Sequence, residues 1–213
     1  MLVQRFDFWH RRMRSRRAAK RRSVFLNVPF DKGYEPLFIA LISALVSLGR
    51  EPHCVLAIPA HGAGRLARIL RLIRSCPISI HDLSRVGQPV RFNMPFELGL
   101  AVALNRIERR PKFIMLESKA HRLVRTLSDV NGFDPGIHES QARGIISCAL
   151  AHLGKPHGNP DAETVFRVRR RLWKTVPALK RISGRNDIYS RSIFAELVEA
   201  AGILAKKEGL IVA

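Results

Sequence analysis

From residue 23 onward the chain alternates short β-type runs with longer helical runs, and this order constrains the fold more than any other feature. Four runs rich in β-branched and aromatic residues are predicted to be strands: 23–30, 53–58, 77–83 and 112–118. Three apolar-periodic runs between them are predicted to be helices: 34–49, 65–76 and 91–104. Strands that alternate with helices favour a parallel sheet with helices on both faces. We therefore predict a three-layer α/β/α fold around a parallel sheet of four or five strands.

The chain beyond residue 118 is predicted to complete this domain and then to become helical. The turn-rich segment 128–138 holds either a short edge strand or none, and 139–153 is predicted to be the last helix of the domain. After the Pro- and Gly-containing break at 154–160, two further helical runs follow. We predict an α/β domain over residues 23–153 and a C-terminal helical extension over 160–213.

The charge of the chain is strongly positive. Lys and Arg number 37 against 17 acids, giving a net charge of +20 and a pI near 11.4, which favours an anionic partner such as nucleic acid, nucleotide phosphate or acidic lipid. Residues 1–22 hold nine basic side chains and one acid. This segment is predicted to be a disordered tail, with a nucleic-acid-binding arm or a misassigned start codon as alternatives.

No segment is predicted to target or cross a membrane. The tail leads into a short apolar run without a small-residue cleavage site, and the longest apolar stretch, 37–48, is too short to span a bilayer. We predict a cytoplasmic protein with no membrane partner. Three widely spaced cysteines in apolar surroundings indicate buried thiols rather than a disulfide framework or a zinc site, so no metal site is predicted.

Candidate functional residues follow the predicted strands. Ligands of an open parallel sheet bind at the carboxyl ends of its strands, near the point where the strand order reverses. Polar residues that follow the strands are Asp31, Lys32, Gly33, Asp82, Ser84, Arg85 and those of the 128–138 loop. Glu97 enters in the first turn of the next helix, 15 residues after Asp82. We predict that these two acids converge on one crevice.

The residue types of this crevice suit a nucleotide. A carboxylate beside a sugar ring can accept its hydroxyl groups, stabilise an oxocarbenium-like centre or attack the anomeric carbon. Arg85 and Arg91 lie in the loop between the two acids, together with Asn93, and a guanidinium binds phosphate through two parallel hydrogen bonds. Nucleotides are therefore the predicted substrate class.

Three stretches of the chain, "VFLNVPFDKGYEPLF", "HDLSR" and "RFNMPFELGLAVAL", resemble the nucleoside 2-deoxyribosyltransferase-like group, which is related in fold to Toll/interleukin-1 receptor (TIR) domains. The resemblance covers about residues 23–153 and extends to a set of bacterial proteins that share these blocks and an SD-x-x-G-x-D-x-x-x-H loop. It implies a flavodoxin-like fold. The run before Glu-Leu-Gly is "VRFNMP" here and not the Asp-Gly-Thr type of the transferases, so fold and acid position carry over, and a particular substrate does not.

The resemblance implies roles for particular residues. Glu97 is similar in position to the nucleophile or ribose-binding acid, and Asp82 to an acid that positions the sugar or base. From their places after the strands and in the loop before Glu97, the predicted substrate-binding residues are Phe30, Asp31, Lys32, Gly33, Ser84, Arg85, Arg91, Asn93, Asp129 and His138. The implied activity is cleavage of the N-glycosidic bond of NAD or a nucleotide, or transfer of its sugar. No cofactor is expected, because NAD would be the substrate. Homo-oligomers are a further expectation.

Each of these features also has a structural interpretation. With Met94 as the cap and Pro95 as the first helical residue, Glu97 would stand third in its helix, where an acid stabilises the helix by about 0.3–1 kcal/mol. Asp82 can simply start a turn, and His81 is predicted to be a hydrogen-bonded core histidine more readily than a base. The two interpretations of Glu97 are compatible.

The functional alternatives remain open at the level of sequence. A domain of this fold can bind a nucleotide as a signalling module without turnover, or serve as a basic, nucleic-acid-associated adaptor. The run "RVRRRLWK" at 167–174 places several cations close together on a predicted helix. Such a run suits either a solvated helix face or a nucleic-acid backbone.

Overall fold

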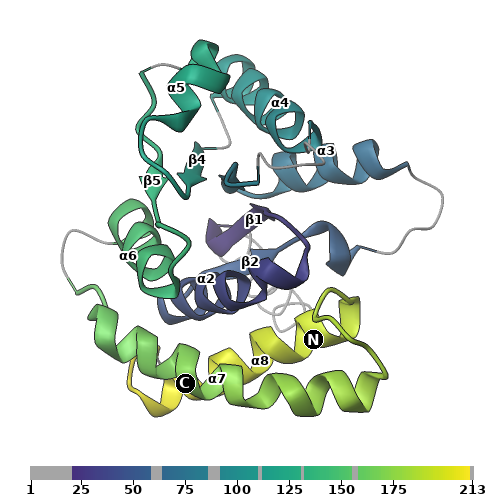
Figure 1. Cartoon of the computed structure of the whole chain (residues 1–213), viewed down its shortest axis with the longest axis vertical. Helices are drawn as coiled ribbons and strands as arrows, with labels where there is room; N and C mark the ends of the chain where they lie inside the picture. The colour runs from purple at the N-terminus through teal and green to yellow at the C-terminus, as the bar shows by residue number, and fades with distance from the viewer. Residues whose placement is uncertain are drawn as a thin grey trace, which may run out of the picture.

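A computed structural model describes residues 21–58, 64–85, 92–109, 112–130, 132–154 and 158–211 (Figure 1). Residues 1–20, most of the predicted tail, and Arg91, a predicted ligand-binding residue, lie outside these ranges. The sheet has five parallel strands in the order β2-β1-β3-β4-β5. They are β1 (Ser23–Asn27), β2 (Glu51–His53), β3 (Ile78–Asp82), β4 (Lys112–Glu117) and β5 (Gly136–Ile137). The predicted parallel sheet is confirmed, with the short fifth strand at one edge.

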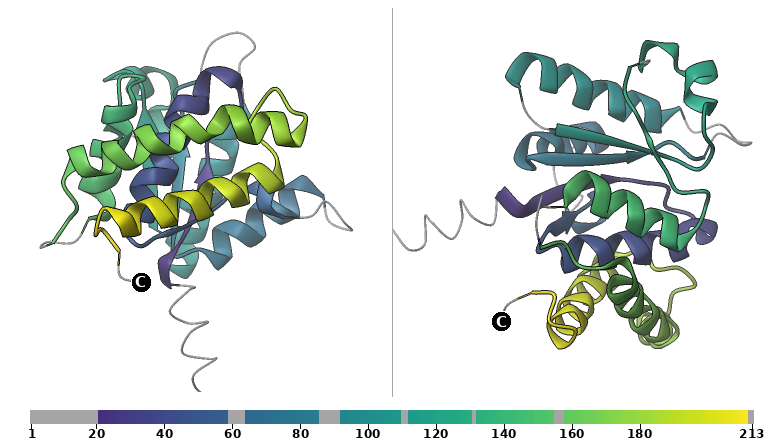
Figure 2. Two further views of the ribbon diagram at one scale, coloured as in Figure 1. Left: turned by 90° about the horizontal axis from the view of Figure 1, so that it is seen from below. Right: turned by 90° about the vertical axis from the view of Figure 1, so that its left-hand side faces the viewer.

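Helices cover both faces of the sheet (Figures 1 and 2). One face is covered by α2 (Glu35–Ser47) and α6 (Ala142–Leu153), and the other by α3 (Arg65–Ser75) and α4 (Asn93–Glu108). The short α5 (Arg122–Thr126) follows β4. Three 3-10 turns are η1 (Lys32–Tyr34), η2 (Val55–Ala57) and η3 (Ser128–Val130). This is the predicted three-layer α/β/α arrangement.

The C-terminal extension adds a fourth layer. Helices α7 (Ala162–Ser183) and α8 (Arg191–Lys207) lie side by side and pack on the outer side of α2 (Figure 2). Helix α2 is therefore enclosed between the sheet and this helical pair, and all its residues except Pro36 are buried. Its nearly continuous apolar sequence follows from this position, because a helix covered on every side has no polar face. Apolar side chains of α7 and α8 belong to the same core as those of α2 and β1.

The prediction of a strand over residues 53–58 is wrong. The strand is Glu51–His53, and Val55–Ala57 forms the turn η2. Pro52 lies within β2, which pairs only with β1 at the edge of the sheet, where a missing backbone donor is tolerated. The apolar run after it is buried by other contacts, because η2 packs against α8 and α3. Periodicity does not distinguish such a turn from a strand.

The start of α4 and the apolar face of α3 also differ from prediction. Helix α4 begins at Asn93, so Glu97 is its fifth residue and does not lie at the third position. In α3 the buried positions are Ile69, Leu72 and Ile73, whereas Leu66, whose spacing from Ile69 and Ile73 is that of one apolar face, is 45% exposed. Both differences reflect the limited precision with which local patterns define helix ends and faces.

Two compositional predictions concern burial and membranes. The cysteines Cys54, Cys76 and Cys148 are free and buried, as predicted. Burial raises the pKa of Cys54 to about 12 and that of Cys76 to about 11. Among the residues that the structure describes, no helix combines the length and the apolar content needed to cross a bilayer.

Candidate functional site

The strand order reverses between β1 and β3, since β2 lies on one side of β1 and β3 on the other. The polar residues that follow these strands meet at the carboxyl edge of the sheet, where ligands of such folds bind. We call them the switch-point cluster; its members are Asp31, Tyr34, Asp82, Ser84, Arg85 and His138. They come from η1 and its N-cap, the end of β3 and the loop between β5 and α6. Five of the six were predicted as site residues.

Asp82 is the centre of this cluster. Its side chain is fully buried, and it accepts hydrogen bonds from the Tyr34 hydroxyl, the Ser84 amide (2.9 Å) and the Ser84 hydroxyl (2.5 Å). Burial by itself raises the pKa of Asp82, but His138, Ser84 and Tyr34 together outweigh it, so the pKa lies below its usual value. Burial and the Asp82 charge raise the pKa of Tyr34 well above 10. Asp82 is thus an ionised carboxylate that joins two loops.

His138 contributes the remaining contact to Asp82. Its Nε2 lies 3.2 Å from Asp82 Oδ2, although the ring N–H is not aimed at that oxygen. Its Nδ1 accepts a hydrogen bond from the Ser140 amide at 3.1 Å, so Nε2 is the ring nitrogen that can carry a proton. A close backbone approach positions the ring: a Cβ at residue 144 would lie 2.3 Å from the His138 carbonyl oxygen, which only glycine permits.

Asp31 and Arg85 form the part of the cluster that reaches solvent. Arg85 donates to both carboxylate oxygens, from Nε to Oδ2 at 3.1 Å and from Nη2 to Oδ1 at 3.0 Å. The Arg85 side chain is 36% exposed and the Asp31 side chain is 26% exposed. Arg85 lies over the η1 turn, and its Nη2 would be 3.0 Å from a Cβ at Gly33. Lys32 and Gly33 are exposed beside this pair.

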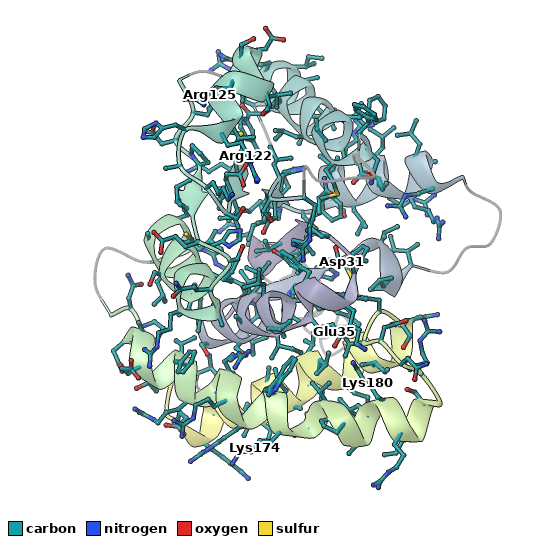
Figure 3. All side chains as sticks on the ribbon, in the orientation of Figure 1. Asp31, Glu35, Arg122, Arg125, Lys174 and Lys180 are labelled. Atoms are coloured by element: carbon teal, nitrogen blue, oxygen red, sulfur yellow. The ribbon has the colours of Figure 1, made fainter. Side chains whose placement is uncertain are left out.

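The C-terminal helices hold the loop that carries Asp31. The Tyr189 hydroxyl donates to the Asp31 carbonyl at 2.8 Å, and the Tyr189 ring packs against Phe30 with centroids 5.4 Å apart. Phe30, predicted to bind substrate, is therefore part of an aromatic cluster under α7 and α8. Lys180 of α7 makes a second contact with this region: it donates to both carboxylate oxygens of Glu35, the first residue of α2, at 2.9 and 2.6 Å (Figure 3).

Glu97 lies in a different environment. It is 4% exposed, and its Oε1 is 3.6 Å from Nη2 of Arg65, whose side chain is 55% exposed. Burial raises the pKa of Glu97, and Arg65 and Asn93 compensate only in part. Two large apolar side chains of the same helix end, Phe92 and Phe96, are 78% and 55% exposed. Glu97 is thus a desolvated acid with one long ion pair, at a helix end that also carries two exposed aromatic rings.

In the part of the chain that the structure describes, Asp82 and Glu97 contact different partners and do not meet in the shared crevice that was predicted. Asp82 accepts a hydrogen bond from Tyr34 and lies 3.2 Å from His138 on the α2–α6 side of the sheet, whereas Glu97 belongs to α4 on the opposite side. The two carboxylates have no common hydrogen-bond or ion-pair partner among the described residues. Asp82 ends β3 and Glu97 belongs to the helix that follows it, and their partners lie on opposite sides of the sheet.

The other predicted residues have separate positions. Asp129 is exposed in η3. Asn93 is the first residue of α4, next to Glu97. His81 is fully buried, with Asn27 Nδ2 3.0 Å from its Nδ1 and Ser79 Oγ 3.0 Å from its Nε2, and burial lowers its pKa to about 3. It is the core histidine that the sequence favours.

Several residues of this edge were not predicted. Tyr34 directly follows the Asp31-Lys32-Gly33 turn and lies in one of the quoted stretches, but it was not named as a site residue. Arg122 of α5 pairs with the buried Glu117 and donates to the Ser84 carbonyl at 3.0 Å (Figure 3), which braces the β3 loop from the β4 side. Arg65, the partner of Glu97, lies in the predicted helix 65–76 and was not named as a site residue. The contacts Arg65–Glu97 and Arg122–Ser84 join residues far apart in sequence, so no local signal identifies them.

Within the described residues, no group of three or more His, Cys, Asp and Glu side chains could hold a metal ion. Comparisons with known proteins add no identification. No protein-family model matches the chain, and no curated protein matches it. The function is therefore argued from the residues themselves.

Proposed function

We propose that the α/β domain cleaves the N-glycosidic bond of NAD or another nucleotide, or transfers its sugar, with Glu97 as the catalytic carboxylate. The observation that carries the proposal is the environment of Glu97: it is a nearly buried acid with a raised pKa and one long ion pair, and its helix end carries two exposed phenylalanines. The resemblance of the Glu-Leu-Gly block to the deoxyribosyltransferase-like group supports the same residue.

A desolvated carboxylate suits this reaction for a physical reason. As the bond to the base breaks, positive charge develops on the sugar, and a nearby anion that is poorly compensated in the resting protein gains the most from that charge. Arg65 compensates Glu97 only at 3.6 Å. Glu97 would attack the anomeric carbon or stabilise the cation, while water or another acceptor completes the reaction.

The remaining residues would bind and position the substrate. Arg85 would offer its guanidinium to phosphate, since more than a third of it is exposed while it is held by Asp31. Phe92 and Phe96 offer apolar surface for a base. Asp82, fully buried and ionised, would act as a positioning residue that orders the loops of Tyr34 and Ser84.

The test is release of free base from NAD and from nucleosides, followed by chromatography, with the full-length protein. We expect Glu97→Gln to lower the rate by about 10²–10⁴-fold, the range that a positioned acid or base contributes. The matched control is Glu108→Gln on the same helix, which removes an exposed carboxylate paired with Arg74 and should leave the rate unchanged. Undiminished release by the Glu97 variant would refute the assignment.

A second candidate is a nucleotide-binding module of the same fold without turnover. The observation in its favour is the complete burial of Asp82, which keeps one of the two expected acids from the ligand. Calorimetry with NAD and ADP-ribose distinguishes the two functions. Binding that Arg85→Ala weakens, with no base released by the wild-type protein, would favour this second candidate.

A further inference from the structure

The outer surface of the C-terminal helical pair carries a dense group of cations that the proposed function does not use. Arg167 and Arg171 of α7 both pair with Glu208, which directly follows α8, at 3.2 and 2.8 Å. The end of α8 therefore lies alongside this part of α7. We call the following residues the α7–α8 basic patch: Arg167, Arg170, Arg171, Lys174, Lys206 and Lys207. All six are exposed.

The charge of this patch is poorly neutralised within the protein. Glu208 is the one carboxylate that pairs with its members in the described part of the chain, and it serves both Arg167 and Arg171. Arg170, Lys174, Lys206 and Lys207 make no ion pair with any described residue. Figure 3 shows Lys174 on the outer side of α7, whereas Lys180 on the same helix is directed toward Glu35.

The basic helix on the opposite side of the molecule is different. Helix α3 carries four arginines, but Arg65 pairs with Glu97, Arg74 pairs with Glu108, and Arg68 donates to the Ile58 carbonyl. Only Arg71 has no ion-pair or hydrogen-bond partner among the described residues. Three of the four arginines of α3 are therefore held by described residues, whereas four of the six cations of the α7–α8 basic patch have no ion pair among the described residues.

We propose that the α7–α8 basic patch binds the phosphate backbone of a nucleic acid. Residues 167, 170, 171 and 174 lie on successive turns of one helix over roughly 10 Å, at a rise of about 1.5 Å per residue, so their charges can contact neighbouring phosphates. Each phosphate that they neutralise releases counterions into solution, which favours binding at low salt.

The contacts of the aromatic side chains indicate backbone binding rather than base stacking. Trp173 and Phe166 are only partly exposed, and guanidinium groups already lie over them: Arg169 is 5.1 Å from the Trp173 ring centroid and Arg143 is 4.1 Å from that of Phe166. Proteins that stack single-stranded bases present open aromatic faces. The patch therefore binds without sequence preference and recognises the charge of the backbone.

The experiment measures the affinity of the full-length protein for a short DNA duplex and a short RNA by fluorescence anisotropy, between about 50 and 200 mM salt. The variant Arg170→Ser/Lys174→Ser removes two unpaired cations. Its dependence of log K on log salt should become shallower by about 1.8 for the duplex, because each lost phosphate contact contributes about 0.9.

The matched control is Arg71→Ser/Arg106→Ser, which removes the same charge from the exposed outer side of α3 and α4. We expect it to leave the slope nearly unchanged. An equal change in both variants would mean that net charge alone attracts the nucleic acid, and no change in either would mean that the patch is not involved. Each outcome would overturn the proposal. The proposal would also be overturned if the protein bound phosphatidylglycerol vesicles more tightly than nucleic acid and Arg170→Ser/Lys174→Ser lost this vesicle binding, because the patch would then bind a lipid surface.

Discussion

The ion pair between Lys180 and Glu35 connects α7 to the first residue of α2. Glu35 is almost completely buried, with 5% of its side chain exposed, and Lys180 is 20% exposed. We predict that Lys180→Met, which keeps the length of the side chain and removes its charge, strongly destabilises the protein. The carboxylate of Glu35 would remain in the interior without its cation.

The magnitude follows from this geometry. Removing one partner of a buried pair costs about 3–5 kcal/mol. Lys180 is partly solvated, and Glu35 begins a helix, where the dipole stabilises an anion by about 0.3–1 kcal/mol. We therefore expect a loss of about 2–4 kcal/mol in the free energy of unfolding. For a chain of this size, each kcal/mol corresponds to about 2–4 °C in Tm.

Urea unfolding followed by circular dichroism measures this loss. Arg185→Met is the matched control on the loop after α7, because its pair with Asp187 is 45% and 40% exposed and is worth about 0–1 kcal/mol. The double variant Lys180→Met/Glu35→Gln should recover part of the loss, since no unpaired charge remains. A loss for Lys180→Met no larger than that of Arg185→Met would refute the reasoning.

Three further predictions concern other parts of the fold. Gly144→Ala should lower the free energy of unfolding by about 1–3 kcal/mol, because the new Cβ would lie 2.3 Å from the His138 carbonyl oxygen. Gly99→Ala, with open space around it, should stabilise α4 by about 0.5–1 kcal/mol. Urea unfolding compares the two variants, and equal effects would contradict the close approach. The lowered pKa of Asp82 stabilises the folded protein above the pKa of Asp82 in the unfolded chain, about 4, and this stabilisation is lost as the pH falls through the pKa of the folded state. The stability of Asp82→Asn should therefore fall less steeply in acid than that of the wild-type protein. Parallel curves of stability against pH for the two proteins would contradict this prediction. A thiol reagent should label the native protein slowly and the urea-unfolded protein fully, because all three cysteines are buried with raised pKa values; rapid native labelling would show that these thiols are accessible.

Local pattern was sufficient for most of the fold. The strands at 23–27, 78–82 and 112–117 and the helix at 35–47 lie within the segments predicted for them, because alternation and apolar runs depend on neighbouring residues. The error at 53–58 arose where an apolar run is buried by distant helices, α8 and α3, and not by pairing in the sheet. Apolar character reports burial, but it does not report which partner provides it.

The candidate site divides in the same way. Position after a strand was enough to bring Asp31, Asp82, Ser84, Arg85 and His138 together, because parallel strands end at one edge of the sheet. It was not enough to predict on which side of the sheet each side chain lies. Asp82 has the parity of the buried Ile80 and faces α2, whereas Glu97 belongs to a helix on the other side.

The order of strands and helices, the buried cysteines and the positive charge were determined by the sequence itself, since each depends on composition or on residues close together in the chain. The tertiary structure decided which charges are paired: Lys180 with Glu35 over 145 positions, Arg85 with Asp31 over 54, and Glu208 with two arginines of α7. It thereby decided which cations remain unpaired on the surface. These pairings depend on how helices pack across the sheet, and packing of distant segments leaves no periodic signal in the chain.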